Sequence, residues 1–148
     1  MFDAYSLLKW MHFVALSLIG GGAVVALLIS GFEDEREDLR GPAATLWQRT
    51  VCWGVRIAIL IGAALLGIKL MNGLHPFSEY YLHLKLMFVV ALAGLSEATP
   101  KALAVGKRGS ALLALMLFLL ASFTVYNKAV FGVKLMPVPP TPVASAAP

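Results

Sequence analysis

Two histidines in apolar surroundings are the residues of this chain best suited to chemistry. His12 lies three residues after Lys9 in the stretch YSLLKWMHF, and His83 lies two residues before Lys85 in YYLHLKL. Residues three apart on a helix share a face, so Lys9 and His12 belong to one surface. Neutral imidazole is a good axial ligand for haem iron, and a neighbouring lysine suits an anionic group such as a haem propionate. These four residues therefore predict a site for haem b.

Four apolar segments must position these residues. The chain has 148 residues, of which 59% are hydrophobic and 14% charged, a composition typical of integral membrane proteins. A hydrocarbon core about 30 Å thick is crossed by about 20 apolar helical residues. The sequence predicts one all-α domain over residues 1–136, an antiparallel four-helix bundle in the membrane, followed by a proline-rich extended tail at 137–148. The expected helices cover about residues 5–31, 45–71, 79–101 and 109–132.

Basic residues in the connections predict the orientation. The first and third connections carry more of them than the second: Arg36, Arg40, Arg49, Lys101, Lys107 and Arg108. The positive-inside rule then places both termini outside the cytoplasm, as expected for a protein of a bacterial inner membrane. Residues 33–40, EDEREDLR, are expected to form a solvated connection or a short surface helix. The net charge of +4 is spread along the chain rather than gathered in a basic block, which argues against nucleic-acid binding.

Antiparallel packing should gather the polar residues of four helix ends in one leaflet. Those ends carry Lys9, His12, Lys69, His83, Lys85, Asn127 and Lys128. An ionisable side chain at the centre of a membrane helix costs roughly 2.5 to 3.5 kcal/mol on insertion scales, so several at one depth indicate a site. Two other readings stay open: the lysines reach the headgroups with their long side chains, and the histidines are hydrogen-bonded packing residues.

The same histidines leave the choice of metal open. His12 and His83 could ligate haem iron, and copper is the alternative because Met11 and Met87 are soft ligands nearby. Cys52 is the only cysteine and is expected to be a buried structural thiol. No nucleophile with a nearby base and no phosphate-binding loop can be found, so no catalytic residue is assigned and enzymatic activity is left open.

Two further predictions concern packing within the membrane. Arg56 lies about two turns into the second helix and Glu97 about one turn before the end of the third, which places them at similar depth. An intramembrane Arg56–Glu97 ion pair is expected, because either charge alone would be costly. Gly20, Gly21 and Gly22 are expected to lie against another helix, since small residues let membrane helices approach closely.

Two short motifs resemble a known group of small membrane proteins. LKWMH, residues 8–12, and LHLKL, residues 82–86, together with the four-helix architecture, resemble the HemJ-type protoporphyrinogen IX oxidases and the related CopD-like and SirB-like proteins. The resemblance implies haem b binding with porphyrinogen oxidation, and by position it applies to His12 and Lys85. CopD-like copper handling is a second expectation. A third expectation is a cofactor-free structural subunit, because the chain has almost no extramembrane mass. The expected partners are the lipid bilayer and either further copies of this chain or a larger membrane complex.

Overall fold

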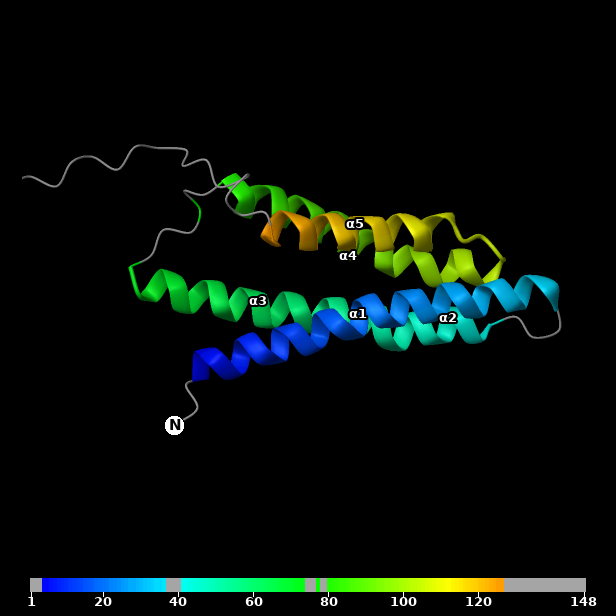
Figure 1. Cartoon of the computed structure of the whole chain (residues 1–148), viewed down its shortest axis with the longest axis horizontal. Helices are drawn as coiled ribbons and strands as arrows, with labels where there is room; N and C mark the ends of the chain where they lie inside the picture. The colour runs from blue at the N-terminus through cyan, green and yellow to red at the C-terminus, as the bar shows by residue number, and fades with distance from the viewer. Residues whose placement is uncertain (1–3, 37–40, 74–76, 78–79, 127–148) are drawn as a thin grey trace, which may run out of the picture.

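The computed structural model describes residues 4–36, 41–73, 77 and 80–126, and these form four long helical segments (Figure 1). The first is α1 (Ala4–Glu35), and the second runs without a break through α2 (Pro42–Trp47), a π-helical turn (Gln48–Cys52) and α3 (Trp53–Met71). The third and fourth are α4 (Tyr80–Ala104) and α5 (Gly109–Tyr126). The prediction of an all-α, antiparallel four-helix bundle is confirmed.

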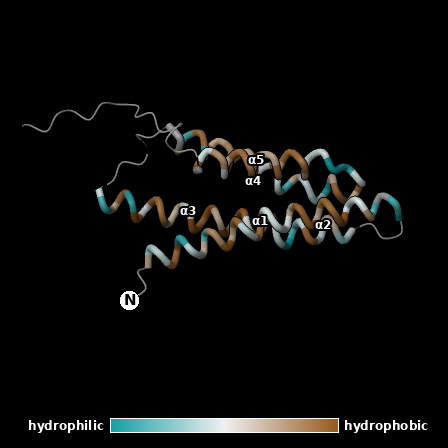
Figure 2. The backbone as a smooth tube through the Cα atoms, viewed as in Figure 1, coloured by the Kyte–Doolittle hydropathy of each residue, from teal (hydrophilic) through white to brown (hydrophobic). Residues whose placement is uncertain are grey.

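Three of these segments are long and apolar enough to cross a membrane: Ala4–Glu33, Pro42–Met71 and Leu82–Ala104. The described apolar part of α5, Gly109–Val125, is shorter. Figure 2 shows hydrophobic residues over most of the length of each helix. Many large apolar side chains point outward, as expected for a surface in contact with lipid. The chain is a helical membrane protein. The predicted end of the fourth helix at 132 and the tail at 137–148 lie outside the described residues.

The helices pack as two hairpins. One consists of α1 with the α2–α3 segment, and the other consists of α4 with α5 (Figure 1). The hairpins contact each other where α2 meets α4 and where α1 meets α5. The buried core of the bundle includes many small residues: Ala15, Ala23, Ala26, Ala58, Ala111 and Ala114. Small side chains let the backbones approach closely, which is how helices associate in a solvent that is itself apolar.

The glycine prediction is correct at two positions and wrong at the third. A Cβ atom on Gly20 would lie 2.9 Å from Cε1 of Phe118, and one on Gly22 would collide with the side chain of Thr50. Gly21, in contrast, has open space around it and is exposed. The three residues are consecutive, so successive Cα positions turn by about 100° and cannot all face a neighbour.

The first helix extends further than predicted, because Glu33 near its end caps the start of α2. The expected end was residue 31, but α1 continues to Glu35, and Glu33 is buried rather than solvated. Its Oε1 accepts a hydrogen bond from the backbone N–H of Ala43 at 2.7 Å. This carboxylate satisfies one of the free N–H groups at the start of α2, whose positive dipole end favours an anion. The second helix accordingly begins at Pro42, not near residue 45.

Candidate functional site

His12 lies on the inward side of α1. His12 lies three residues before Ala15 and seven before Ile19, which are both buried, so the three residues share one face of α1. The His12 ring is half-buried. The ring packs against α3 where that helix has no side chain: a Cβ on Gly62 would lie 3.5 Å from Cε1 of His12. The Nδ1 atom is buried and makes no direct hydrogen bond among the described residues, while the backbone of Ala58 on α3 interacts with the ring. The ring therefore lies between α1 and α3 in mainly apolar surroundings.

Lys85 lies on the inward side of α4, in the half of the bundle that also holds His12 (Figure 1). It lies eleven residues, about three turns, before the buried Ser96, so it shares the inward side of α4. Its ammonium group is near enough to His12 and to Lys69 of α3 to disfavour a second positive charge on either of them. His12, Lys69 and Lys85 thus lie on three helices at the same end of the bundle (Figure 1), and no hydrogen bond joins them in the described part of the chain.

The other predicted site residues lie elsewhere. His83 is exposed, and its ring lies edge-on to Phe77 with 6.5 Å between the ring centroids. Lys9 is exposed on α1. The candidate copper ligands Met11 and Met87 also point outward. Asn127 and Lys128 lie outside the described residues. In the described part of the chain no group of three or more His, Cys, Asp or Glu side chains is placed to hold a metal ion.

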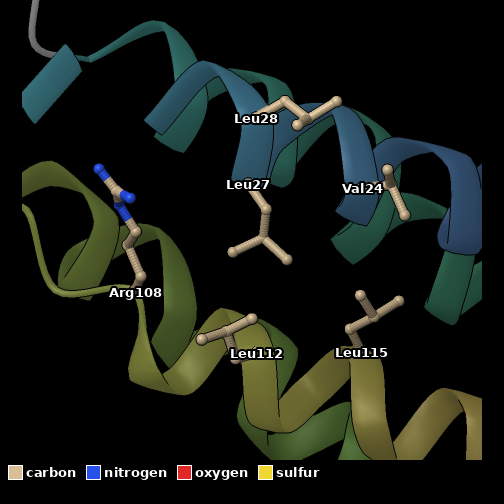
Figure 3. Close-up of a pocket in the computed structure, with 6 residues that line it drawn as sticks. All are labelled: Val24, Leu27, Leu28, Arg108, Leu112 and Leu115. Atoms are coloured by element: carbon tan, nitrogen blue, oxygen red, sulfur yellow. The ribbon is translucent and has the colours of Figure 1, made fainter. Parts of the chain in front are cut away.

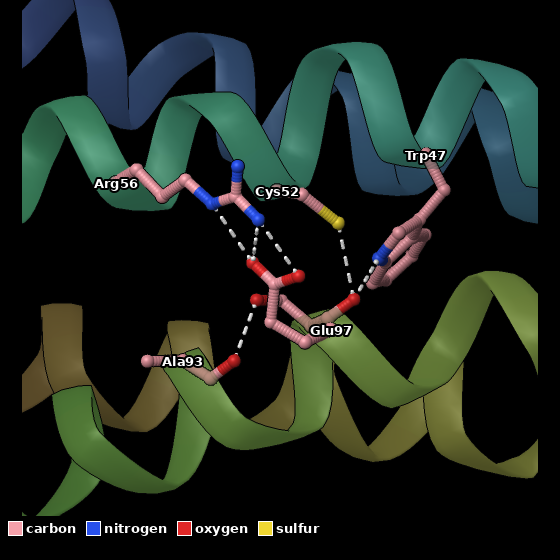
Figure 4. A network of polar contacts seen from close by, with 6 residues as sticks. Trp47, Cys52, Arg56, Ala93 and Glu97 are labelled. Atoms are coloured by element: carbon pink, nitrogen blue, oxygen red, sulfur yellow. Dashed lines mark hydrogen bonds and ion pairs between the residues drawn. The ribbon is translucent and has the colours of Figure 1, made fainter.

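A second polar cluster crosses from the α2–α3 segment to α4 (Figure 4). The predicted ion pair is present: Nε and Nη2 of Arg56 donate to Oε1 and Oε2 of Glu97, each at 3.0 Å. The Arg56 guanidinium also lies over the Trp53 ring, 5.2 Å from its centroid. A bidentate pair of this kind fixes orientation as well as charge. It holds the two hairpins together at one level of the membrane.

Beside the ion pair, one backbone carbonyl of α4 accepts two side-chain donors. Pro100 lies inside α4 and has no N–H, so the carbonyl of Ser96, four residues earlier, loses its helical partner. This oxygen instead accepts the indole N–H of Trp47 at 3.2 Å and the thiol of Cys52 at 3.1 Å (Figure 4). Cys52 is free and buried, as predicted. Neighbouring side chains thus replace the hydrogen bond that proline removes, the usual way a membrane helix tolerates proline.

The π-helical turn explains why both donors reach the same oxygen. Trp47 and Cys52 are five residues apart, and in an ordinary α-helix they would point about 140° away from each other. The turn Gln48–Cys52 instead has the wider i to i+5 hydrogen-bonding pattern, which brings residues five apart onto one face. Sequence reasoning missed this acceptor. The only signal for it was Pro100 within an apolar segment, since nothing in the residue pattern marks the π-helical turn.

The end of the bundle at which α1 ends and α5 begins contains a small apolar cavity between these two helices (Figure 3). Its volume is about 260 Å³, and its lining consists of Val24, Leu27, Leu28, Arg108, Leu112 and Leu115. Nη2 of Arg108 donates to the carbonyl oxygens of Ser30 and Gly31 at 2.8 and 3.4 Å. The arginine thus ties the start of α5 to the last turns of α1.

Comparison with models of known protein families, with characterised proteins and with solved structures finds no match for this chain.

Proposed function

We propose that this helical membrane protein binds haem b, with His12 as an axial ligand. The observation that carries the proposal is that His12, whose half-buried ring packs against Gly62 of α3, and Lys85 both lie on the inward sides of their helices, at the same end of the bundle (Figure 1). Two polar groups brought to one depth of an apolar bundle are costly unless they serve a bound group. They are also the two residues to which the resemblance to HemJ-type oxidases applies.

The chemistry of these residues fits haem. The Nδ1 atom of His12 is buried and makes no direct hydrogen bond in the described ranges, so the ring nitrogen could bind a metal at little cost in lost hydrogen bonds. Imidazole nitrogen is an axial ligand of haem iron, and the small residues Ala58 and Gly62 line the helix opposite. Lys85 would act as the second ligand or, with Lys69, neutralise the propionates. His83 is exposed on the other side of α4 and is therefore not assigned as a ligand.

Haem bound here would supply one-electron redox chemistry within the membrane. The residues of this chain would bind it, hold its orientation and exclude water from it. Electron transfer and porphyrinogen oxidation are the two activities that this chemistry supports. Copper handling is less well supported, since Met11 and Met87 point away from His12. The basic residues of the first and third connections support an inner-membrane orientation with both termini outside the cytoplasm.

The test is the visible spectrum of the purified protein, first oxidised and then reduced with dithionite. We expect a Soret band in the oxidised protein and sharp α and β bands in the reduced protein. Lys85→Met should shift these bands if the lysine is the second ligand, and should leave them in place but weaken haem retention if it binds a propionate. His83→Ala is the matched control on the exposed side of α4. A protein expressed with ample haem that shows no visible bands would contradict the proposal.

A further inference from the structure

The Arg56–Glu97 pair joins two of the membrane-spanning segments, Pro42–Met71 and Leu82–Ala104, and both residues lie within those segments. Arg56 stands at the centre of the 30-residue membrane helix Pro42–Met71, and Glu97 is held at the same level by two hydrogen bonds. Yet about half of each side chain is exposed, 51% for Arg56 and 50% for Glu97. Ionisable residues at this depth almost always face protein or a water-filled cavity. Some further group must therefore cover the exposed half of this pair.

The exposed half faces away from the interior of the bundle. The α3 residues that pack on α1, such as Gly54 and Ala58, are buried. At about 100° per residue, Arg56 points about 160° away from Ala58. On α4, Glu97 lies about 100° from Ser96, which belongs to the buried stripe of that helix. The pair thus sits on the outer edge of the contact between α3 and α4.

Large apolar side chains surround the pair on this outer surface. Trp53 lies beneath the Arg56 guanidinium and is itself exposed. Leu60, one turn further along α3, is 70% exposed, and Val90, two turns before Glu97 on α4, is 71% exposed. A paired arginine and a tryptophan within an apolar rim is the composition of an interface centre, where such residues contribute most of the binding energy. We call Trp53, Arg56, Leu60, Val90 and Glu97 the α3–α4 patch.

We infer that the α3–α4 patch is covered by a second copy of this chain, related to the first by a two-fold axis in the membrane. A two-fold interface presents the same residues from both sides, so each Arg56 would approach the Glu97 of the other copy. The patch carries one positive and one negative group and is therefore complementary to itself. Figure 4 shows Nη1 of Arg56 turned away from Glu97, while Nε and Nη2 make the bonds within the chain. A partner that carried charge of only one sign would place a like charge against either Arg56 or Glu97. This inference does not depend on haem binding.

The first experiment is disulfide cross-linking in proteoliposomes with a large excess of lipid. Cys52→Ser removes the native thiol and keeps a donor for the Ser96 carbonyl. In that background Leu60→Cys should give an oxidised band at twice the monomer mass. Phe13→Cys is the matched control: Phe13 is exposed on α1 at the same depth, because its neighbour His12 packs against Gly62. Equal cross-linking of both variants, or of neither, would overturn the inference. A cross-link to a different protein in native membranes would also overturn it.

A second experiment tests the charges. The variants Arg56→Glu and Glu97→Arg each place two like charges in the α3–α4 patch, so neither should cross-link with itself through Leu60→Cys. When the two variants are coexpressed, a mixed dimer places the two acidic groups of the Arg56→Glu copy opposite the two basic groups of the Glu97→Arg copy. We expect the cross-link to return at least several-fold in the mixture, as a band that contains both variants. No recovery in the mixture, while the parent carrying Leu60→Cys does cross-link, would show that these charges do not meet across the interface and would overturn the inference.

Discussion

The indole N–H of Trp47 donates a hydrogen bond to the backbone carbonyl of Ser96, 3.2 Å away on the facing helix. This carbonyl is available because Pro100 cannot donate to it. The contact therefore joins a local defect of α4 to a wide turn of the α2–α3 segment. Since Trp47 is fully buried, the bond also fixes how the two hairpins approach each other.

Trp47→Phe should destabilise the bundle by about 1–3 kcal/mol, because it leaves the Ser96 carbonyl with only the weak thiol donor of Cys52. Pro100→Ala restores an N–H within α4 and should reduce that loss. Unfolding free energies of the two single variants and the double variant in detergent measure the coupling. Trp10→Phe, at an exposed position, is the control. If Trp47→Phe lowers the free energy of unfolding equally in the wild-type chain and in Pro100→Ala, the tryptophan acts by packing alone.

Gly22→Ala and Gly21→Ala should have opposite effects on stability although they are adjacent. The added methyl group at Gly22 would collide with Thr50, whose hydroxyl is held by a 2.8 Å hydrogen bond to the Leu46 carbonyl. Overpacking of this kind costs about 1–3 kcal/mol. At Gly21 there is open space, so the better helix propensity of alanine should stabilise by up to about 1 kcal/mol. Thermal unfolding of the two variants decides, and a larger loss at Gly21 would refute this packing of α1.

Glu33 should be replaceable by glutamine at a smaller cost than by alanine. Glu33→Gln keeps an oxygen that can accept the Ala43 N–H and loses mainly the interaction of the charge with the helix dipole. Glu33→Ala removes the cap as well, which costs about 0.5–2 kcal/mol. Hydrogen exchange at the Ala43 amide should accelerate most in Glu33→Ala. Glu35→Ala, at an exposed position nearby, is the control and should leave this amide protected.

The sequence was sufficient to predict the features that depend only on how far along a membrane helix a residue lies. Counting apolar residues predicts the helices, and antiparallel counting predicts that Arg56 meets Glu97. Features that depend on rotation about a helix axis were harder. His83 and Lys85 are two residues apart and point about 160° from each other, and only the packing of α4 shows that Lys85 faces inward.

Features that depend on irregular backbone were not predictable from hydropathy. The double acceptor at Ser96 requires both Pro100 and the π-helical turn, and the turn has no marker in the residue pattern. The burial of Glu33 was missed for a related reason. A carboxylate in a charged run is ordinarily solvated, and its partner at Ala43 is recognisable only once α2 is seen to begin at Pro42.

The most direct test of the haem proposal is the amount of haem that the purified protein retains per chain, measured as the pyridine haemochrome. The wild-type protein and His83→Ala should retain equimolar haem if Lys85 is the second ligand, whereas His12→Ala should retain almost none while remaining folded by circular dichroism. Haem retention in His12→Ala equal to that of the wild-type protein would contradict the assignment of His12 as an axial ligand.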